Sequence, residues 1–313
     1  MSDTLLVINQ KAGRGNPGLK IVKIVNVFSE NGMFPEIYLT QSKGDAYEKV
    51  KAKAGEYKKV ICYGGDGTLD EVTAAVIKSG YNPTIGYIPA GSTNDFAHSL
   101  NLSCSNVKKA TEDAIKGKEF ACDIGALNGR YFVYVAAFGL FTEVSYKTAQ
   151  DMKNILGHAA YILEGAMSLF DIKTYNLKIK VDDDYLEGEF IYGMITNSES
   201  VGGIKNITGN DVEFDDGKFE VVFVKKSNNP IETNQIIQAL ITHKPSDLVY
   251  MGKASRVEIE TEDEIQWTLD GEDGGSYSNA VIENYNKLIN IVVPNRADDD
   301  KVENDEADDD DEE

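Results

Sequence analysis

Short apolar runs and helical patterns alternate through the first third of the chain. The apolar run at residues 5–8 ends at Asn9, and apolar residues then recur at helical spacing from 19 to 30. The alternation continues, with strands expected at 34–39, 60–63 and 84–88 and helices expected at 45–57 and 69–78. Because strands that alternate with helices of this length form parallel βαβ units, we expect an N-terminal Rossmann-like parallel α/β domain over residues 1–122.

From about residue 123 the pattern changes to short strands separated by clusters of Gly, Asn and Asp. Strands are expected at 131–138, 177–181, 190–196, 219–224, 256–259, 265–269 and 288–293. Helical patterns cover only 143–170 and 231–241, and the apolar side of the first fits a core helix, an acyl-chain groove or a membrane-facing helix. We therefore expect an antiparallel β-rich, sandwich-like second domain over residues 123–294, the end of which could pack back on the first domain.

The charge of the chain is concentrated at its end. From Asp298 to Glu313 there are twelve acidic residues and one lysine, so this segment carries −11 of the net charge of −21. Because such a block repels itself and cannot bury apolar area, we expect residues 295–313 to form a disordered acidic tail, either solubilising or regulatory. The acidic balance also argues against nucleic acid as a partner.

Cysteine content and hydropathy point to a cytoplasmic protein. Cys62, Cys104 and Cys122 are widely spaced and odd in number, which is typical of free thiols in a reducing compartment. No N-terminal stretch resembles a leader peptide, and the longest apolar run, 132–141, is shorter than the ~18 residues of a membrane span. We therefore expect any membrane contact to be peripheral.

The sequence GGDGT (64–68) lies where the third predicted strand meets a helix. Glycines there let backbone N–H groups approach a phosphate, and the helix N-terminus adds partial positive charge. Asp66 adds a carboxylate that can hold Mg²⁺ beside phosphates. A plain tight turn is the alternative, but an aspartate beside phosphate is unfavourable unless a metal is present.

Two further clusters follow strands. PAGSTNDFA (89–97) follows the next parallel strand, and loops at the carboxyl ends of neighbouring strands line one crevice, so we expect it to face GGDGT. Asn94 and Asp95 could also cap the following helix. LDGE (269–272) lies far downstream and fits a tight turn when taken alone. Together with the other clusters it could position an acceptor hydroxyl for phosphoryl transfer.

These motifs resemble those of a known family. GGDGT, PAGSTNDFA, Asp123-Ile124-Gly125 and LDGE, in this order and spacing, resemble the bacterial diacylglycerol kinases, which are soluble lipid kinases. The resemblance covers about residues 4–294. GGDGT alone is shared with NAD kinases, so an NAD kinase or another soluble-acceptor kinase, and a non-catalytic nucleotide-binding sensor, stay as alternatives. A polyprenol, a sphingoid base or a monoacylglycerol stays open as acceptor beside diacylglycerol.

The resemblance implies a two-domain protein with an ATP site in the cleft between the domains. It assigns Glu272 as the general base for the lipid hydroxyl, with Asp270 in support and Asp123 as a further acidic residue. Asp66 and Asp95 would serve the catalytic Mg²⁺ and the phosphates. The implied nucleotide-binding residues are Asn9, Lys11, Ala12, Gly13, Thr40, Gly64, Gly65, Asp66, Gly67, Thr68, Leu69, Asp70, Glu71 and Ser92.

The resemblance also implies a structural Mg²⁺ site at residues 213–218. There Asp216 would give a carboxylate, and Glu213 and Lys218 would give backbone oxygens. By itself, a DDG sequence before a strand more often marks a turn. The substrate lipid would be presented at the inner membrane surface, where this protein would bind peripherally, and only the resemblance suggests a homodimer.

Overall fold

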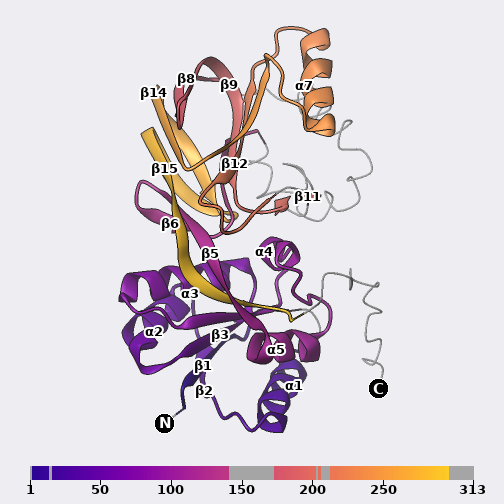
Figure 1. Cartoon of the computed structure of the whole chain (residues 1–313), viewed down its shortest axis with the longest axis vertical. Helices are drawn as coiled ribbons and strands as arrows, with labels where there is room; N and C mark the ends of the chain where they lie inside the picture. The colour runs from indigo at the N-terminus through magenta and orange to yellow at the C-terminus, as the bar shows by residue number, and fades with distance from the viewer. Residues whose placement is uncertain (1, 14–15, 141–172, 202–203, 206–211, 296–313) are drawn as a thin grey trace. The chain divides into compact units, whose positions relative to one another are not determined.

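The structure is a computed structural model that describes residues 2–13, 16–140, 173–201, 204–205 and 212–295 (Figure 1). The chain divides into two compact units. Unit 1 comprises Met1–Cys122 with the segment from Lys287 onward, and unit 2 comprises Asp123–Asn286. The predicted helix at 143–170 and the predicted acidic tail, apart from its first residue, lie outside the described residues.

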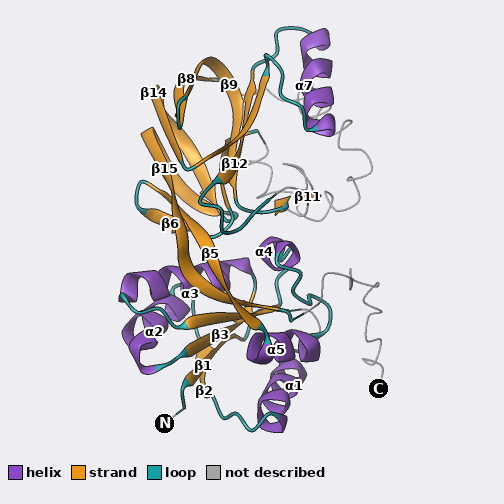
Figure 2. Cartoon of the chain, in the orientation of Figure 1, coloured by secondary structure: helices purple, strands orange, loops and turns teal. Residues whose placement is uncertain are grey.

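Unit 1 is built on four parallel strands in the order β4-β3-β1-β2. The end of β15 adds to β4 in parallel through the pair Ile291 and Ile85. The strands are β1 (Thr4–Asn9), β2 (Glu36–Thr40), β3 (Lys59–Gly64) and β4 (Thr84–Pro89). The helices are α1 (Pro17–Glu30), α2 (Asp45–Lys53), α3 (Asp66–Ser79), α4 (Asp95–Ser99) and α5 (Val107–Lys116), with a 3₁₀ turn η1 (Ala54–Glu56) (Figure 2).

Helices pack as two pairs in unit 1, α1 with α5 and α2 with α3. Ile24 and Phe28 of α1 join one apolar cluster with Ala110 and Ala114 of α5 and with the strand residues Leu6, Ile8, Ile61, Tyr63 and Ile88. All four residues of the apolar run 5–8 are fully buried, so both faces of β1 are covered. Each such side chain contributes about 1.5–3 kcal/mol when it is fully buried.

Unit 2 is made of antiparallel pairs, as the sequence predicts. The strand order is β13-β12-β9-β7-β14-β15, and β8 pairs with both β9 and β14. The strands are β5 (Lys118–Leu127), β6 (Arg130–Phe132), β7 (Val135–Gly139), β8 (Tyr175–Val181), β9 (Asp184–Thr196), β10 (Ser200–Val201), β11 (Ile204–Lys205), β12 (Phe219–Lys225), β13 (Val249–Ala254), β14 (Arg256–Leu269) and β15 (Glu272–Val293). One helix, α7 (Pro230–Thr242), is described in unit 2.

Aromatic side chains fill the core of unit 2. Trp267 is fully buried, and its ring lies 4.9 Å from that of Phe138 in an edge-on arrangement. Strand β8 alternates buried and exposed residues along its whole length, which places Tyr175 and every second residue after it in this core. Helix α7 begins at Asn229, whose side chain accepts hydrogen bonds from two of the first N–H groups of the helix.

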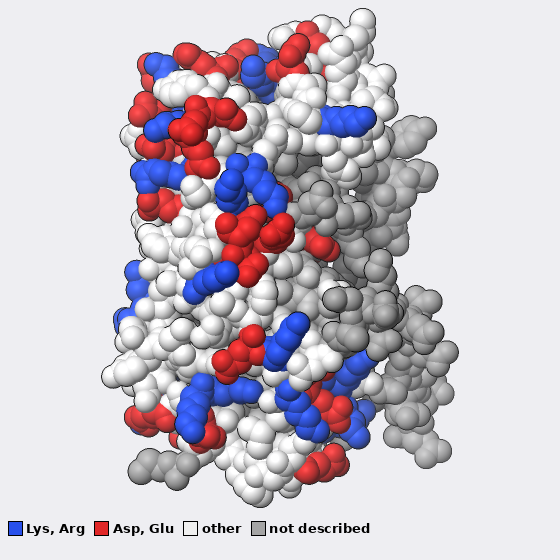
Figure 3. All heavy atoms as spheres, in the orientation of Figure 1, with Lys and Arg blue, Asp and Glu red and all other residues white. Residues whose placement is uncertain are grey.

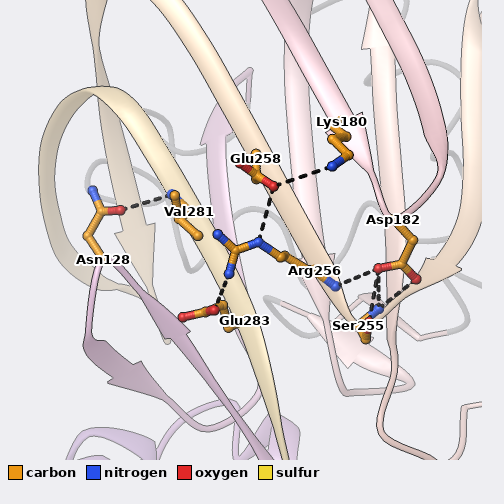
Figure 4. A network of polar contacts seen from close by, with 8 residues as sticks. All are labelled: Asn128, Lys180, Asp182, Ser255, Arg256, Glu258, Val281 and Glu283. Carbon is orange, nitrogen blue, oxygen red and sulfur yellow. Dashed lines mark hydrogen bonds and ion pairs between the residues drawn. The ribbon is translucent and has the colours of Figure 1, made fainter.

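A charged network ties three strands of unit 2 together outside the predicted site (Figure 4). Arg256 forms ion pairs with Glu258 and Glu283. The Asp182 carboxylate accepts hydrogen bonds from the backbone N–H groups of Ser255 and Arg256 at 2.9–3.2 Å. Since these side chains are partly exposed, the ion pairs contribute little to stability, and we regard the network as fixing the strand register.

The fold differs from the sequence prediction at several places, among them the expected strand 131–138, which is two strands, β6 and β7, and β13 and α4, for which no residue ranges were predicted. The expected strands 256–259 and 265–269 are one strand, β14, with a register shift between Glu260 and Ile265. Strand β15 is 22 residues long rather than six, because it continues from the turn at its start into unit 1. Helix α5 and strand β5 were not predicted, since the apolar residues of 107–127 are interrupted by lysines at helix positions that are exposed in the structure.

Other sequence predictions can be checked directly. The three cysteines are free, and Cys62 and Cys122 are buried. Among the helices that the structure describes, none has the length and apolarity needed to cross a bilayer. Cationic and acidic side chains are interspersed over the face drawn in Figure 3, with no continuous basic area among its described residues.

Candidate active site

Two glycine-containing loops meet at the carboxyl ends of β3 and β4. The backbone N–H of Ala90 donates to the carbonyl of Gly64 at 2.7 Å, which extends the pairing of the two strands into the loops. A Cβ atom on Gly65 would lie 3.1 Å from the Cα of Gly91, so the two chains are in backbone contact. The prediction that GGDGT and PAGSTND face each other is confirmed within unit 1.

Asp66 is the first residue of α3 and points toward the second loop. Its carboxylate accepts hydrogen bonds from the Thr93 hydroxyl at 3.2 Å and from the Tyr87 hydroxyl at 3.4 Å. Burial, and secondarily the neighbouring carboxylate of Asp95, raise the pKa of Asp66 to about 6. Asp95 is itself only 1 % exposed. A half-buried carboxylate next to a buried one favours a proton or a divalent cation, and this pair therefore fits the predicted Mg²⁺.

Asn94 shapes the second loop rather than capping the helix that follows it. Its backbone is left-handed at φ 50°, and its side chain makes no capping hydrogen bond to α4. Instead the side-chain oxygen accepts from the Gly91 N–H at 2.7 Å, and the side-chain amide donates to the Gly91 carbonyl at 3.1 Å. The capping alternative is thus wrong for Asn94, because both ends of its amide are used to close the loop.

The loop after β1 approaches the start of α3. The Asn9 side chain donates to the Thr68 hydroxyl at 3.1 Å and accepts from the Lys11 N–H at 3.0 Å. The N–H of Ala12 donates to the Asn9 carbonyl at 3.1 Å, so residues 9–12 form a tight turn. Gly13 follows with φ 91°, a conformation that favours glycine. These predicted nucleotide-binding residues are therefore brought together with GGDGT.

The remaining predicted nucleotide-binding residues have different surroundings. Glu71 accepts from the Gly44 N–H at 2.7 Å, which links α3 to the start of α2. Thr40 ends β2, and its carbonyl accepts from the Gln10 side chain at 3.4 Å. Leu69 is buried in the core, so only its backbone is available to a ligand. Asp70 is half-buried and Ser92 is exposed, and their roles stay predictions.

In unit 2 the LDGE sequence forms a two-residue hairpin turn between β14 and β15. Asp270 and Gly271 have φ values of 49° and 80°, and Leu269 pairs with Glu272, as in a type I′ turn. The turn alternative suggested by the sequence is therefore confirmed. It is compatible with a role for Glu272, because the turn presents this half-buried carboxylate at the first position of β15.

Asp270 holds this turn through the backbone of unit 2. Its carboxylate is buried and accepts three N–H groups, from Val133 at 2.6 Å and from Tyr134 and Val135 at 2.9 Å each. Its own N–H donates to the Val135 carbonyl at 2.9 Å. Asp270, predicted among the catalytic residues, thus has the contacts of a positioning residue.

Asp123 is fully buried and anchors the turn at 213–218. Its carboxylate accepts from the Gly217 N–H at 2.7 Å and from the side-chain amides of Asn284 at 3.3 Å and Asn286 at 3.0 Å. Its N–H donates to the Phe214 carbonyl at 2.8 Å. Neither asparagine was predicted from the sequence, because nothing local distinguishes them and they lie more than 160 residues from Asp123.

The Asp216 carboxylate, which the resemblance assigns to a structural metal, has two hydrogen-bond partners in the structure. One oxygen of Asp216 accepts from the Lys218 N–H at 2.9 Å, and the other lies 3.2 Å from the Lys253 ammonium. Lys253 also pairs with Glu220 at 3.3 Å. Burial raises the pKa of Glu220 to about 7 although Lys253 opposes the shift. Among the described residues, no group of three His, Cys, Asp or Glu side chains could hold a metal. The Lys253 ammonium therefore lies beside the carboxylate that the resemblance assigns to Mg²⁺, and that assignment stays a prediction.

Comparisons with known proteins agree on one family. The family models described as diacylglycerol kinase catalytic domain and as YegS C-terminal NAD kinase β-sandwich-like domain match residues 3–127 and 135–293. The chain is 31 % identical to a diacylglycerol kinase of Bacillus subtilis (strain 168) over 94 % of this chain and 97 % of that protein. A Staphylococcus epidermidis diacylglycerol kinase is 34 % identical over 82 % of this chain and 81 % of its own length.

A solved structure is similar as well. A protein from Bacillus anthracis str. Sterne, provisionally named a diacylglycerol kinase, aligns with a TM-score of 0.79 at 27 % sequence identity. The alignment covers 94 % of this chain and 98 % of that one. The likeness therefore extends over both units.

Proposed function

Because this chain belongs to the diacylglycerol kinase family and is an enzyme of that type, we propose that it transfers the γ-phosphoryl group of ATP to the hydroxyl of diacylglycerol, with Mg²⁺. The observation that carries the proposal is the Asp66–Asp95 carboxylate pair, in which Asp95 is buried and Asp66 half-buried, where two glycine-containing loops meet. Such a pair needs a cation or a proton, and Mg²⁺ beside a triphosphate supplies the cation.

The nucleotide is assigned to unit 1. Glycines 64, 65 and 67 leave backbone N–H groups free of side chains at the N-terminus of α3, where partial positive charge favours phosphate. Asn9 and Thr68 are joined by a hydrogen bond, and they set the distance between the loop after β1 and this helix. We assign Asn9, Lys11 to Gly13 and Ser92 to the same nucleotide.

The metal is assigned to the Asp66–Asp95 pair. When bound, Mg²⁺ would neutralise charge on the triphosphate and on both carboxylates. Thr93 and Tyr87 hold the Asp66 carboxylate in place through their hydroxyl groups. Both hydroxyls donate to the carboxylate, and so they oppose, without cancelling, the rise in its pKa that burial and Asp95 cause.

The acceptor hydroxyl is assigned to Glu272. In the proposed reaction the lipid oxygen attacks the γ-phosphorus and its proton passes to the Glu272 carboxylate, while the bond to the β-phosphate oxygen breaks and ADP leaves. Asp270 keeps the turn that carries Glu272 in one conformation through three backbone N–H groups. The product is phosphatidic acid.

The substrate would be presented at a membrane surface, so we propose peripheral contact with the inner face of the cytoplasmic membrane. A homodimer is proposed on family resemblance alone, and sedimentation of the purified chain tests it. The β-sandwich-like domain of the family is described by its likeness to NAD kinase, which makes a soluble acceptor such as NAD the second candidate.

The test is transfer of labelled γ-phosphate from ATP to a panel of lipids in mixed micelles and to NAD, with Mg²⁺ or with EDTA. We expect metal-dependent labelling of diacylglycerol. Glu272→Ala should lose most of this transfer. Glu264→Gln is the control, because the Glu264 carboxylate on β14 is exposed, and this variant should keep wild-type transfer. Labelling of NAD alone would replace the proposal, and wild-type turnover in Glu272→Ala would remove the assigned base.

A further inference from the structure

Tyr63 carries a buried hydroxyl group that has no hydrogen-bond partner among the described residues. It is the fifth residue of β3, and its ring packs in the apolar cluster formed by the strands with α1 and α5. The side chain is 1 % exposed, and its oxygen makes no hydrogen bond with any residue that the structure describes. Burial raises the pKa of the Tyr63 hydroxyl, so the group remains a protonated donor at neutral pH.

The hydroxyl lies directly against the loop that joins β1 to α1. A Cβ atom on Gly13 would be 2.9 Å from the Tyr63 oxygen and 3.9 Å from the Cβ of Ala90. The hydroxyl is therefore placed where the loops after β1 and β4 approach each other.

A buried donor without a partner destabilises a protein relative to one that is hydrogen-bonded. A phenylalanine at this position would pack in the same apolar cluster without that cost. The ring packs in the apolar cluster, and the hydroxyl adds no hydrogen bond to the described residues of the fold. The hydroxyl lies against Gly13, which we assign to the nucleotide. A ligand oxygen beside Gly13 would give the hydroxyl a partner.

We propose that Tyr63 is a nucleotide-binding residue whose hydroxyl donates a hydrogen bond to a phosphate oxygen of a nucleotide held at residues 9–13, which follow β1. The inference rests on the proposed function, because it takes the phosphate from ATP. Gly13 has no side chain that would stand between the phosphate and the hydroxyl. Its φ of 91° is a second reason for glycine at this position, because other residues rarely adopt it.

The test compares Tyr63→Phe with wild type in two measurements, thermal unfolding without nucleotide and binding of a nucleotide. The probes are the non-hydrolysable ATP analogue AMP-PNP with Mg²⁺, and adenosine, which has no phosphate. Tyr57→Phe is the matched control, since Tyr57 is also a buried tyrosine of unit 1 but its hydroxyl donates to Glu36. Nothing assigns Tyr57 to the nucleotide.

We expect Tyr63→Phe to unfold at the same or a higher temperature than wild type and to bind AMP-PNP roughly tenfold more weakly. Its affinity for adenosine should be unchanged, because the lost bond is to phosphate. Tyr57→Phe should unfold at a lower temperature and bind AMP-PNP as wild type does.

Equal affinity of Tyr63→Phe and wild type for AMP-PNP would overturn the inference and leave the proposed kinase function standing. Equal losses for AMP-PNP and adenosine would also overturn it, because the hydroxyl would then act on the loop rather than on phosphate. Failure of the wild-type protein to bind AMP-PNP at all would overturn both this inference and the proposed function.

Discussion

Gly91 lies so close to Gly65 that a Cβ atom on Gly91 would be 2.9 Å from the Gly65 Cα and 2.7 Å from the Asn94 side-chain oxygen. The two loops that bring Asp66 and Asp95 together therefore touch through backbone alone. A side chain at this point separates the loops or breaks the bond from Asn94 to Gly91. The contact explains why two glycine-containing motifs far apart in sequence belong to one site.

We predict that Gly91→Ala lowers the free energy of unfolding by about 1–3 kcal/mol, since the added methyl group must push backbone or the Asn94 amide aside. The rate of phosphoryl transfer should fall by more than the loss of folded protein accounts for, because Asp66 and Asp95 move apart. Urea unfolding and the transfer assay check the two effects. Wild-type values in both assays would show that the loops accommodate a side chain.

Asp66 makes stability depend on pH in a defined direction. Its pKa is raised from 3.8 to about 6 in the folded protein, so the folded state holds this proton more tightly than the unfolded state. Ionisation between about pH 4 and pH 6 therefore costs stability, and asparagine avoids that cost. We predict that Asp66→Asn in EDTA is more stable than wild type above pH 6, by on the order of 1–2 kcal/mol.

The gain from Asp66→Asn should disappear below pH 4, where the wild-type carboxyl is protonated in both states. Thermal unfolding at pH 4, 6 and 8 measures it. Asp263→Asn, at an exposed position on β14, is the control and should show no such gain. A loss of stability at pH 8 in Asp66→Asn would contradict the assigned cause. Phosphoryl transfer should be lost, since the metal ligand is gone.

Removing the Asp270 carboxylate should lower the free energy of unfolding more than removing the exposed carboxylate of Asp263. We predict that Asp270→Ala lowers the free energy of unfolding by about 3–5 kcal/mol, because three buried N–H groups lose a charged acceptor. Urea unfolding measures the loss, with Asp263→Ala as the exposed control. A loss below about 1 kcal/mol would show that water replaces the carboxylate.

Lys253 allows a test of the structural metal. We predict that Lys253→Met is less stable than wild type in EDTA at pH 8, because Asp216 and Glu220 lose the ammonium that they share. Lowering the pH to 6 should reduce the difference, since the pKa of Glu220 is about 7 and its protonation removes one charge. Millimolar Mg²⁺ should restore part of the stability at pH 8.

The unfolding temperature of Lys253→Met is measured with EDTA or with Mg²⁺ at both pH values. The double variant Lys253→Met/Asp216→Asn is the control, because any stabilisation by Mg²⁺ bound at Asp216 should be absent from it. If Lys253→Met equals wild type in EDTA, the ammonium does not serve as the cation of this turn. If Mg²⁺ raises the unfolding temperature of wild type and Asp216→Asn abolishes the rise, the metal binds there beside Lys253.

The sequence by itself determined the local elements and the motifs. Apolar periodicity placed the strands β1, β3 and β4 and the helices between them, because a strand and a helix bury different repeats of side chains. The rule that loops after neighbouring parallel strands meet then placed Gly65 beside Gly91. The turn at Asp270-Gly271 could also be predicted, because the positive φ values that such a turn needs are set by the local Asp-Gly sequence.

Only the tertiary structure decided which partners the buried carboxylates have. Asp270 accepts N–H groups from a strand more than 130 residues earlier, and Asp123 accepts from two asparagines more than 160 residues later. Tyr63, a core residue by its apolar pattern, was shown to hold its hydroxyl against Gly13. Hydrophobic patterns state which side chains are buried, but hydrogen bonds between distant segments depend on the register in which those segments meet.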